Sequence, residues 1–206
     1  SGASATLRHV WGASPRDVYA VGEGGTLLHY NGASWSAQYS GTTNTLYGVW
    51  GSSSTNILAV GGPPGTIVHS DGSTWTLQPA FTYGGAFSGT HFAVWGLSRN
   101  RLFLPSSTLN VYIGLSGGST GWDSPGDFRA MWGASDSWWW IVSSDSRVGG
   151  GGNLANMCLP PCSSVGVVYG PNYNMKGVWG SSQGLVIAVG ETLSGGGNIV
   201  RGTLAP

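Results

Sequence analysis

Two glutamates stand at equivalent points of the sequence and suggest acid–base chemistry. Glu23 and Glu191 each directly follow an Ala-Val-Gly triplet. A pair of carboxylates can hydrolyse a glycosidic bond, one as the general acid and the other as base or nucleophile. The simpler interpretation, which we favour, is that both are loop residues in solvent. The sequence contains no Gly-x-Ser-x-Gly nucleophile elbow, and its glycine runs lack the lysine of a P-loop. We therefore expect no catalysis.

Two histidines also recur at matching points. His29 lies in Thr-Leu-Leu-His-Tyr and His69 in Thr-Ile-Val-His-Ser. A catalytic histidine would not be expected to recur in this way, so a structural role and a ligand contact are the two interpretations.

The two cysteines, Cys158 and Cys162, flank Leu-Pro-Pro. We expect a small disulfide loop, with free thiols as the alternative. A metal site would need further ligands, and no histidine lies between 92 and 206. No cofactor is expected.

These residues belong to a unit that the chain repeats five times. Each copy begins with an apolar residue, Trp and Gly, followed a few residues later by an apolar run of strand length. The repeat tryptophans are Trp11, Trp50, Trp95, Trp132 and Trp179, at spacings of 39, 45, 37 and 47 residues. A period of about 40–45 residues is typical of β-propeller blades.

Each copy divides into strand-length pieces separated by the residues that turns require. We predict an all-β, five-bladed β-propeller with four antiparallel strands per blade, in a single domain covering 1–206. The expected blades are about 7–39, 46–78, 91–123, 128–169 and 175–206. The last copy ends before its fourth strand, so residues 1–6 are expected to supply that strand and close the ring.

The residue three before each repeat tryptophan forms a mixed set of cations and aromatics: Arg8, Tyr47, Phe92, Arg129 and Lys176. On a first strand, alternation places these residues on the face opposite the tryptophan. They could surround the mouth of a central channel and attract an anionic or sugar ligand, or they could pack and pair between blades. Trp138 is a further candidate, because its counterparts are Asp17, Asn56, Arg101 and Leu185. An exposed aromatic there would suit a sugar or a partner surface.

Composition narrows the classes of partner. Of 206 residues, 8% are charged and the net charge is zero, against about 25% charged residues in average soluble domains. We therefore expect neither nucleic-acid binding nor membrane insertion. The surface rich in Ser, Thr, Gly and Asn, together with the expected disulfide, favours secretion to the extracellular space, with the periplasm or the cell surface as alternatives. The chain begins at Ser1 without Met, as a processed form or an excised domain would.

The most regular copies carry a family resemblance. The stretches concerned are Val10–Gly22 with Gly25–Trp35, Val49–Gly61 with Gly65–Trp75, and Val178–Gly190. They resemble the repeat of bacterial secreted propeller proteins. They are also similar to Asp-box units of sialidase-like propellers and to photosystem II assembly-factor propellers. Ser70–Trp75 is the part nearest to an Asp-box, which is a folding device. Nothing matches the arginine cluster, tyrosine and carboxylate base of sialidases, and tachylectin-type lectins share only the blade count.

Together these features favour a secreted, non-catalytic binding module. We expect a carbohydrate ligand in shallow inter-blade or loop sites lined by aromatic, Asn and Ser/Thr groups. A protein surface is the other expected type of ligand. A structural or self-assembling surface protein is the alternative, since a charge-poor surface favours homo-oligomers. A glycoside hydrolase is the third.

Overall fold

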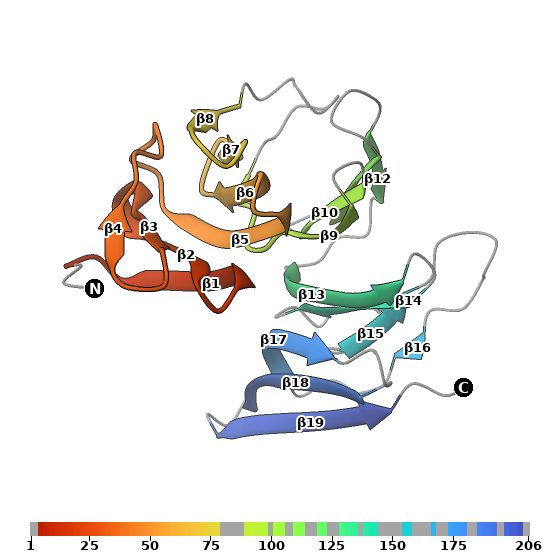
Figure 1. Cartoon of the computed structure of the whole chain (residues 1–206). Coiled ribbons are helices and arrows are strands. Elements are labelled where there is room, and N and C mark those ends of the chain that lie inside the picture. The colour runs from red at the N-terminus through yellow and green to blue at the C-terminus, as the bar shows by residue number, and fades with distance from the viewer. Residues whose placement is uncertain are drawn as a thin grey trace. The chain divides into compact units, whose positions relative to one another are not determined.

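The computed structural model describes residues 4–78, 89–98, 101–105, 109–113, 119–122, 128–135, 138–143, 154–157, 166–167, 173–180, 185–192 and 196–203. These residues form five separate antiparallel sheets and one short 3-10 helix, η1 (Glu23–Gly25) (Figure 1). Within these ranges there is no α-helix. The predicted all-β class and the four-stranded antiparallel sheets are therefore confirmed.

In every sheet, strands that follow one another in the chain lie side by side. The first sheet contains β1 (Leu7–Ser14), β2 (Asp17–Gly22), β3 (Leu27–Tyr30) and β4 (Trp35–Ala37). The second contains β5 (Leu46–Ser53), β6 (Asn56–Gly61), β7 (Ile67–Ser70) and β8 (Trp75–Leu77). The third contains β9 (Trp95–Ser98), β10 (Arg101–Pro105), β11 (Leu109–Ile113) and β12 (Ser119–Trp122).

The last two sheets follow the same plan. The fourth contains β13 (Phe128–Ser135), β14 (Trp138–Ser143), β15 (Leu154–Met157) and β16 (Gly166–Val167). The fifth contains β17 (Tyr173–Gly180), β18 (Leu185–Thr192) and β19 (Gly197–Thr203), and has three strands among the described residues. Residues 4–6 form no strand, and the Thr6 carbonyl accepts a hydrogen bond from the Glu23 N–H at the start of η1 (3.0 Å). Ring closure by residues 1–6 stays a prediction.

The chain divides into two compact units. The first comprises Ser1–Leu104 with Asn110–Gly121, and the second Pro105–Leu109 with Trp122–Pro206. The first unit thus carries the first two sheets and most of the third, and the second unit carries the last two sheets together with Pro105, Leu109 and Trp122 at strand ends of the third.

The Val-Trp-Gly motif packs successive sheets together. A Cβ added to Gly51 would lie 2.6 Å from the Trp11 ring, and one added to Gly180 would lie 2.3 Å from the Trp132 ring. The tryptophan of one sheet therefore covers the glycine of the next, where no larger residue fits. Trp11 borders a core cluster that includes Val49, which is fully buried. This contact explains why Trp and Gly recur as a pair.

Matching turns lead into β4 and β8. Asn31 Oδ1 accepts hydrogen bonds from the N–H groups of the two residues before Trp35, both at 3.0 Å. Asp71 Oδ1 accepts the equivalent two bonds at 2.9 Å, and these bonds hold the pKa of its carboxyl well below the usual range. Gly32 and Gly72 supply the positive φ of 94° and 95° that the turns need. The turn at Asp71 is thus a folding device, as the resemblance implied.

Candidate functional site

A β-bulge lies near the start of the first strand in four of the sheets. Strand pairing shifts register around one residue, so that two residues of the first strand face one residue of the second. The extra residues are Arg8, Tyr47, Arg129 and Lys176. These are four of the five residues that sequence analysis singled out three places before the repeat tryptophan. The fifth, Phe92, lies just before β9. A bulge redirects a side chain, and bulges are common beside functional sites.

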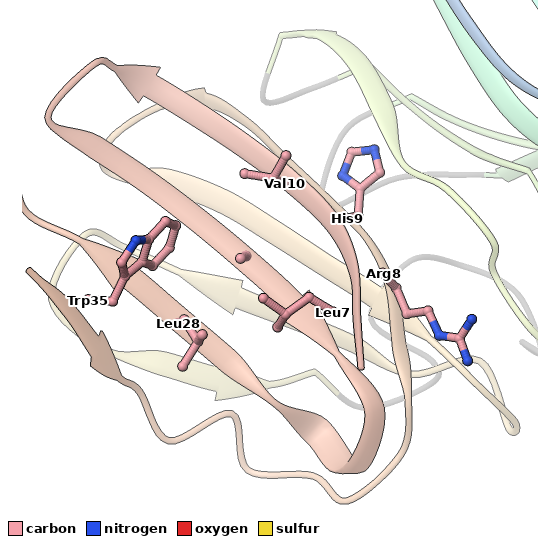
Figure 2. Close-up of a pocket in the computed structure, with 7 residues that line it drawn as sticks. Leu7, Arg8, His9, Val10, Leu28 and Trp35 are labelled. Atoms are coloured by element: carbon pink, nitrogen blue, oxygen red, sulfur yellow. The ribbon is translucent and has the colours of Figure 1, made fainter. Parts of the chain in front are cut away.

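The bulge changes the side of the sheet on which Arg8 lies. Figure 2 shows Leu7 and Val10 on one side of the first sheet and Arg8 and His9 on the other. On that other side, His9 Nδ1 accepts a hydrogen bond from the Val49 N–H at 3.4 Å. Trp11 also lies on this side, because it covers Gly51 of the second sheet. The prediction that Arg8 lies on the face opposite the tryptophan is therefore wrong, because the extra residue interrupts the alternation.

Arg8 pairs with one of the two glutamates considered for catalysis. Its guanidinium Nη2 donates to Glu23 Oε1, at the end of the first sheet where β1 begins and β2 ends. Both side chains are about half exposed, at 45% and 42%. Arg8 holds the pKa of the Glu23 carboxyl below its usual range. A general acid needs a raised pKa, so this environment does not suit Glu23 for that role.

The fifth sheet repeats this arrangement. Lys176 Nζ donates to Glu191 Oε1 at 2.5 Å, again between the bulge of the first strand and the end of the second. Both side chains are about half exposed, at 53% and 49%. Glu23 and Glu191 are therefore equivalent in the structure too, because each pairs with the cation at the bulge of its own repeat.

An aromatic contact replaces the ion pair at the same position of the second sheet. The Tyr47 ring meets the Phe92 ring edge to face, with centroids 5.8 Å apart. Arg129 has an interaction partner too. Each of the two ion pairs lies within one repeat, whereas the Tyr47–Phe92 contact joins the second sheet to the segment before β9. The choice between a channel-mouth site and packing between blades stays a prediction.

The two repeated histidines make equivalent hydrogen bonds. His29 Nε2 donates to Asp17 Oδ1 at 2.7 Å, and His69 Nε2 donates to Asn56 Oδ1 at 2.9 Å. His29 also stacks on Tyr19, with ring centroids 4.4 Å apart. Tyr19 is buried, which, with the Asp17 charge, raises its pKa to about 12. The same hydrogen bond is made to a carboxylate in one repeat and to an amide in the other, and the recurrence of this contact favours a structural role.

An apolar hollow of about 440 Å³ lies on the Leu7 side of the first sheet, with Val10, Leu28 and Trp35 in its lining (Figure 2). Its residues have counterparts in the second sheet. Val10 is 59% exposed, whereas its counterpart Val49 is fully buried in the core cluster shared by the first two sheets. The hollow therefore lies on the face that this repeat uses to pack against a neighbouring sheet, and we assign it no ligand.

Other candidates fall partly or wholly outside the described residues. Cys158 and Cys162 lie outside them. The backbone of Trp138 begins β14, paired with Ser135 across the hairpin, and its side chain is not described. Among the described residues no group of three or more His, Cys, Asp or Glu side chains is arranged to hold a metal ion. No helix within the described ranges has the length and apolar character to cross a membrane.

Sequence reasoning missed the bulges and one exposed aromatic. Gly48 and Gly177 directly follow two of the bulged residues, and a glycine inside a strand pattern is a known sign of a bulge. Tyr39, in the linker between the first two sheets, is 86% exposed. No repeat position singles it out.

Comparison with solved structures places the fold among β-propellers. The chain is similar to YCF48 bound to D1 peptide, with a TM-score of 0.69 and 14% identity over 97% of this chain. The chain spans 64% of the length of that structure. It is also similar to YCF48 from Cyanidioschyzon merolae, with a TM-score of 0.65, 12% identity and coverage of 100% of this chain and 74% of the other. The Cps50 (Swd1) β-propeller domain of Myceliophteria thermophila gives a TM-score of 0.66 at 11% identity, covering 98% and 72%.

No protein-family model matches the chain, and no curated protein matches it in sequence. At these identities the structural likeness shows the fold alone.

Proposed function

We propose that this protein is a non-catalytic scaffold that binds an extended peptide at the strand ends where the bulges lie. One observation carries the proposal: the first-strand position that holds Arg8 in the first sheet holds Tyr47 in the second and Phe92 before the third. All three residues belong to the first compact unit. A repeated position that presents charged and aromatic side chains instead of core residues is a feature of a binding surface.

The side chains indicate the ligand chemistry. The planar guanidinium of Arg8 suits a carboxylate, and the Tyr47–Phe92 pair suits an apolar side chain. The Arg8–Glu23 pair is exposed, and exposed ion pairs contribute little to stability, so a ligand carboxylate can replace Glu23. We therefore expect a peptide with an acidic residue close to an apolar one. The similarity to YCF48 bound to D1 peptide supports a peptide ligand.

The test is a screen of a fluorescent library of short acidic–apolar peptides by anisotropy, followed by variants. We expect Arg8→Ala and Tyr47→Ala each to weaken the best peptide by roughly 10-fold, as for loss of one good contact. Arg16→Ala is the matched control, because it removes the same charge from an exposed residue at the opposite end of β1 and β2. Equal weakening by Arg8→Ala and Arg16→Ala would show only nonspecific charge attraction. A library without any binder would refute the proposal.

Ring closure is part of the proposed fold. The first sheet's open face, with Val10 exposed where Val49 is buried, supports a further sheet covering it. Carbohydrate binding is the second candidate function, favoured by the exposed Tyr39 in a polar linker. Self-association, an extracellular location and the Cys158–Cys162 disulfide stay predictions. So does a glycoside hydrolase, for which the ion pairing of Glu23 gives no support.

A further inference from the structure

Tyr39 is unusual among the large hydrophobic side chains described. Its exposed fraction of 86% is the highest of those that are exposed, and it belongs to the segment that links β4 to β5. A tyrosine ring held in water gains no free energy from burial, so its position has no explanation in the packing of the first two sheets. A tyrosine ring with both faces in water can stack on the ring of a ligand, while its hydroxyl forms a hydrogen bond.

The linker that carries Tyr39 is held by hydrogen bonds on both sides. The Gln38 N–H donates to the Leu27 carbonyl at 2.9 Å, and the buried Ser40 hydroxyl donates to the Gly25 carbonyl at 2.7 Å. Further along, Asn44 Nδ2 donates to Thr66 Oγ1 at 2.8 Å and to the Pro63 carbonyl at 3.1 Å. The linker is thus fixed to the first sheet and the second. A ligand that binds this linker therefore loses less binding free energy to the ordering of the chain.

A hollow of about 360 Å³ lies against this linker, lined by Tyr39, Gly41, Thr42, Thr43 and Asn44. Gly41 has a φ of 75°, a turn conformation that favours glycine. The volume is near the lower end of the roughly 300–1,000 Å³ range of small-molecule sites. No charged side chain belongs to this lining.

The polar groups of the hollow match hydroxyl groups. Both hydrogens of the Asn44 amide are engaged with Pro63 and Thr66, which leaves Oδ1 as an acceptor directed by a fixed amide. The Thr43 and Tyr39 hydroxyls can each donate and accept. A neutral, saturated ring with C–H groups on one face and several hydroxyls at its edge satisfies the aromatic platform and these groups together. A sugar ring has this chemistry.

We propose that Tyr39, Thr43 and Asn44 form a binding site for one neutral sugar ring, with the ring stacked on Tyr39 and its hydroxyls bonded to Thr43 and Asn44. This site rests on the second candidate function and is separate from the peptide surface at Arg8 and Tyr47. The structure therefore allows the two to be tested independently in the same protein.

The experiment is an NMR titration of the full chain with N-acetylglucosamine, methyl α-mannoside and methyl β-galactoside, monitored by backbone amide shifts. We expect at least one sugar to shift residues 39–44 in a saturable manner. Tyr39→Ala should weaken that sugar by about 10-fold or more through loss of the platform. Tyr39→Phe should retain most of the affinity, and Thr43→Val should weaken it while preserving shape. Arg16→Ala should titrate as the unmodified chain does.

Three outcomes would overturn the proposal: no saturable shift in residues 39–44 with any of the sugars, equal affinity for Tyr39→Ala, or shifts there with a proline-rich peptide and none with sugars. Repeating the peptide titration with Tyr39→Ala separates this result from the proposed function. If Tyr39→Ala loses sugar binding and keeps peptide binding, the protein has two separate sites. If the peptide library contains no binder, the proposed peptide function fails, and the sugar titration still tests the Tyr39 site by itself.

Discussion

Gly51 lies beneath the indole ring of Trp11, and its replacement by alanine tests whether this contact joins the first two sheets. The added Cβ would lie 2.6 Å from Trp11 Cη2, 3.0 Å from Cζ2 and 3.0 Å from the Asn56 carbonyl oxygen, whereas ordinary contacts are 3.4–4 Å. The ring must therefore move by about 1 Å in a packed region, and such overpacking typically costs about 1–3 kcal/mol. Removing a strand glycine returns roughly 0.5–1 kcal/mol of backbone entropy. We expect Gly51→Ala to be destabilised by about 1–2 kcal/mol.

The assay is urea unfolding together with thermal unfolding, where a loss of this size should lower Tm by roughly 2–8 °C for a chain of this length. Gly197→Ala is the matched control, because its Cβ would meet nothing within 4 Å and its backbone lies in a strand. Trp11→Phe removes the two ring atoms in question, so Gly51→Ala should cost less in that background by about 1 kcal/mol. The contact with the Asn56 carbonyl remains when Trp11 is replaced. The reasoning is refuted if Gly51→Ala is as stable as the parent. It is also refuted if the substitution costs the same with Phe at position 11.

Three further predictions concern the first unit. Burial lowers the pKa of His91 from 6.5 to about 4 in the folded protein, so the contribution of His91 to the free energy of unfolding is highest above pH 6.5, where His91 is neutral in both states. It should fall by about 3 kcal/mol between pH 6.5 and pH 4, because the unfolded chain takes up the proton first. Urea unfolding at these two pH values should show the loss, and a His91→Phe variant should lack this part of it. Asp71→Asn should lower the Tm at pH 7 less than Asp71→Ala does, because an amide at this position makes the same turn bonds, as Asn31 does. The part of the stability that depends on the Asp71 charge should be present above pH 3.8 and fade below it, since folding lowers the pKa of this carboxyl, so the Tm difference between the parent and Asp71→Asn should shrink in acid. Val49→Asp should unfold the protein or destabilise it by several kcal/mol, because it buries a charge. Val10→Asp should have the same effect, because ring closure would cover the Val10 face of the first sheet with a further sheet. A Val10→Asp protein as stable as the parent would exclude ring closure at this face.

The order of strands follows from local features of the sequence. Alternating apolar residues and Gly, Asn and Asp at the turns predict where the strands of the first two sheets begin and end, and the structure has them at 7–37 and 46–77. The turn chemistry was equally accessible, because Asn31 and Asp71 bond to backbone groups two and three residues away. Interactions of this range are readable in a single sequence.

The candidate site was predictable in part. Counting three residues back from each tryptophan led to Arg8 and Tyr47, and the structure shows that the count had located β-bulges. Strict alternation predicts the wrong face for Arg8, because it assumes that each residue of β1 lies opposite one residue of β2, whereas at the bulge two residues of β1 face one of β2.

By itself, the sequence determined the fold class, the repeat and the Trp–Gly pair that defines each unit, since all of these are periodic or local. The tertiary structure alone decided three things: that Trp11 covers Gly51 of the next sheet, that Arg8 pairs with Glu23, and that Tyr39 stands in solvent. The physical reason is that a side chain's partner and exposure depend on the register between strands and the packing between sheets. Both are set by contacts between residues distant in the chain, which no local pattern records.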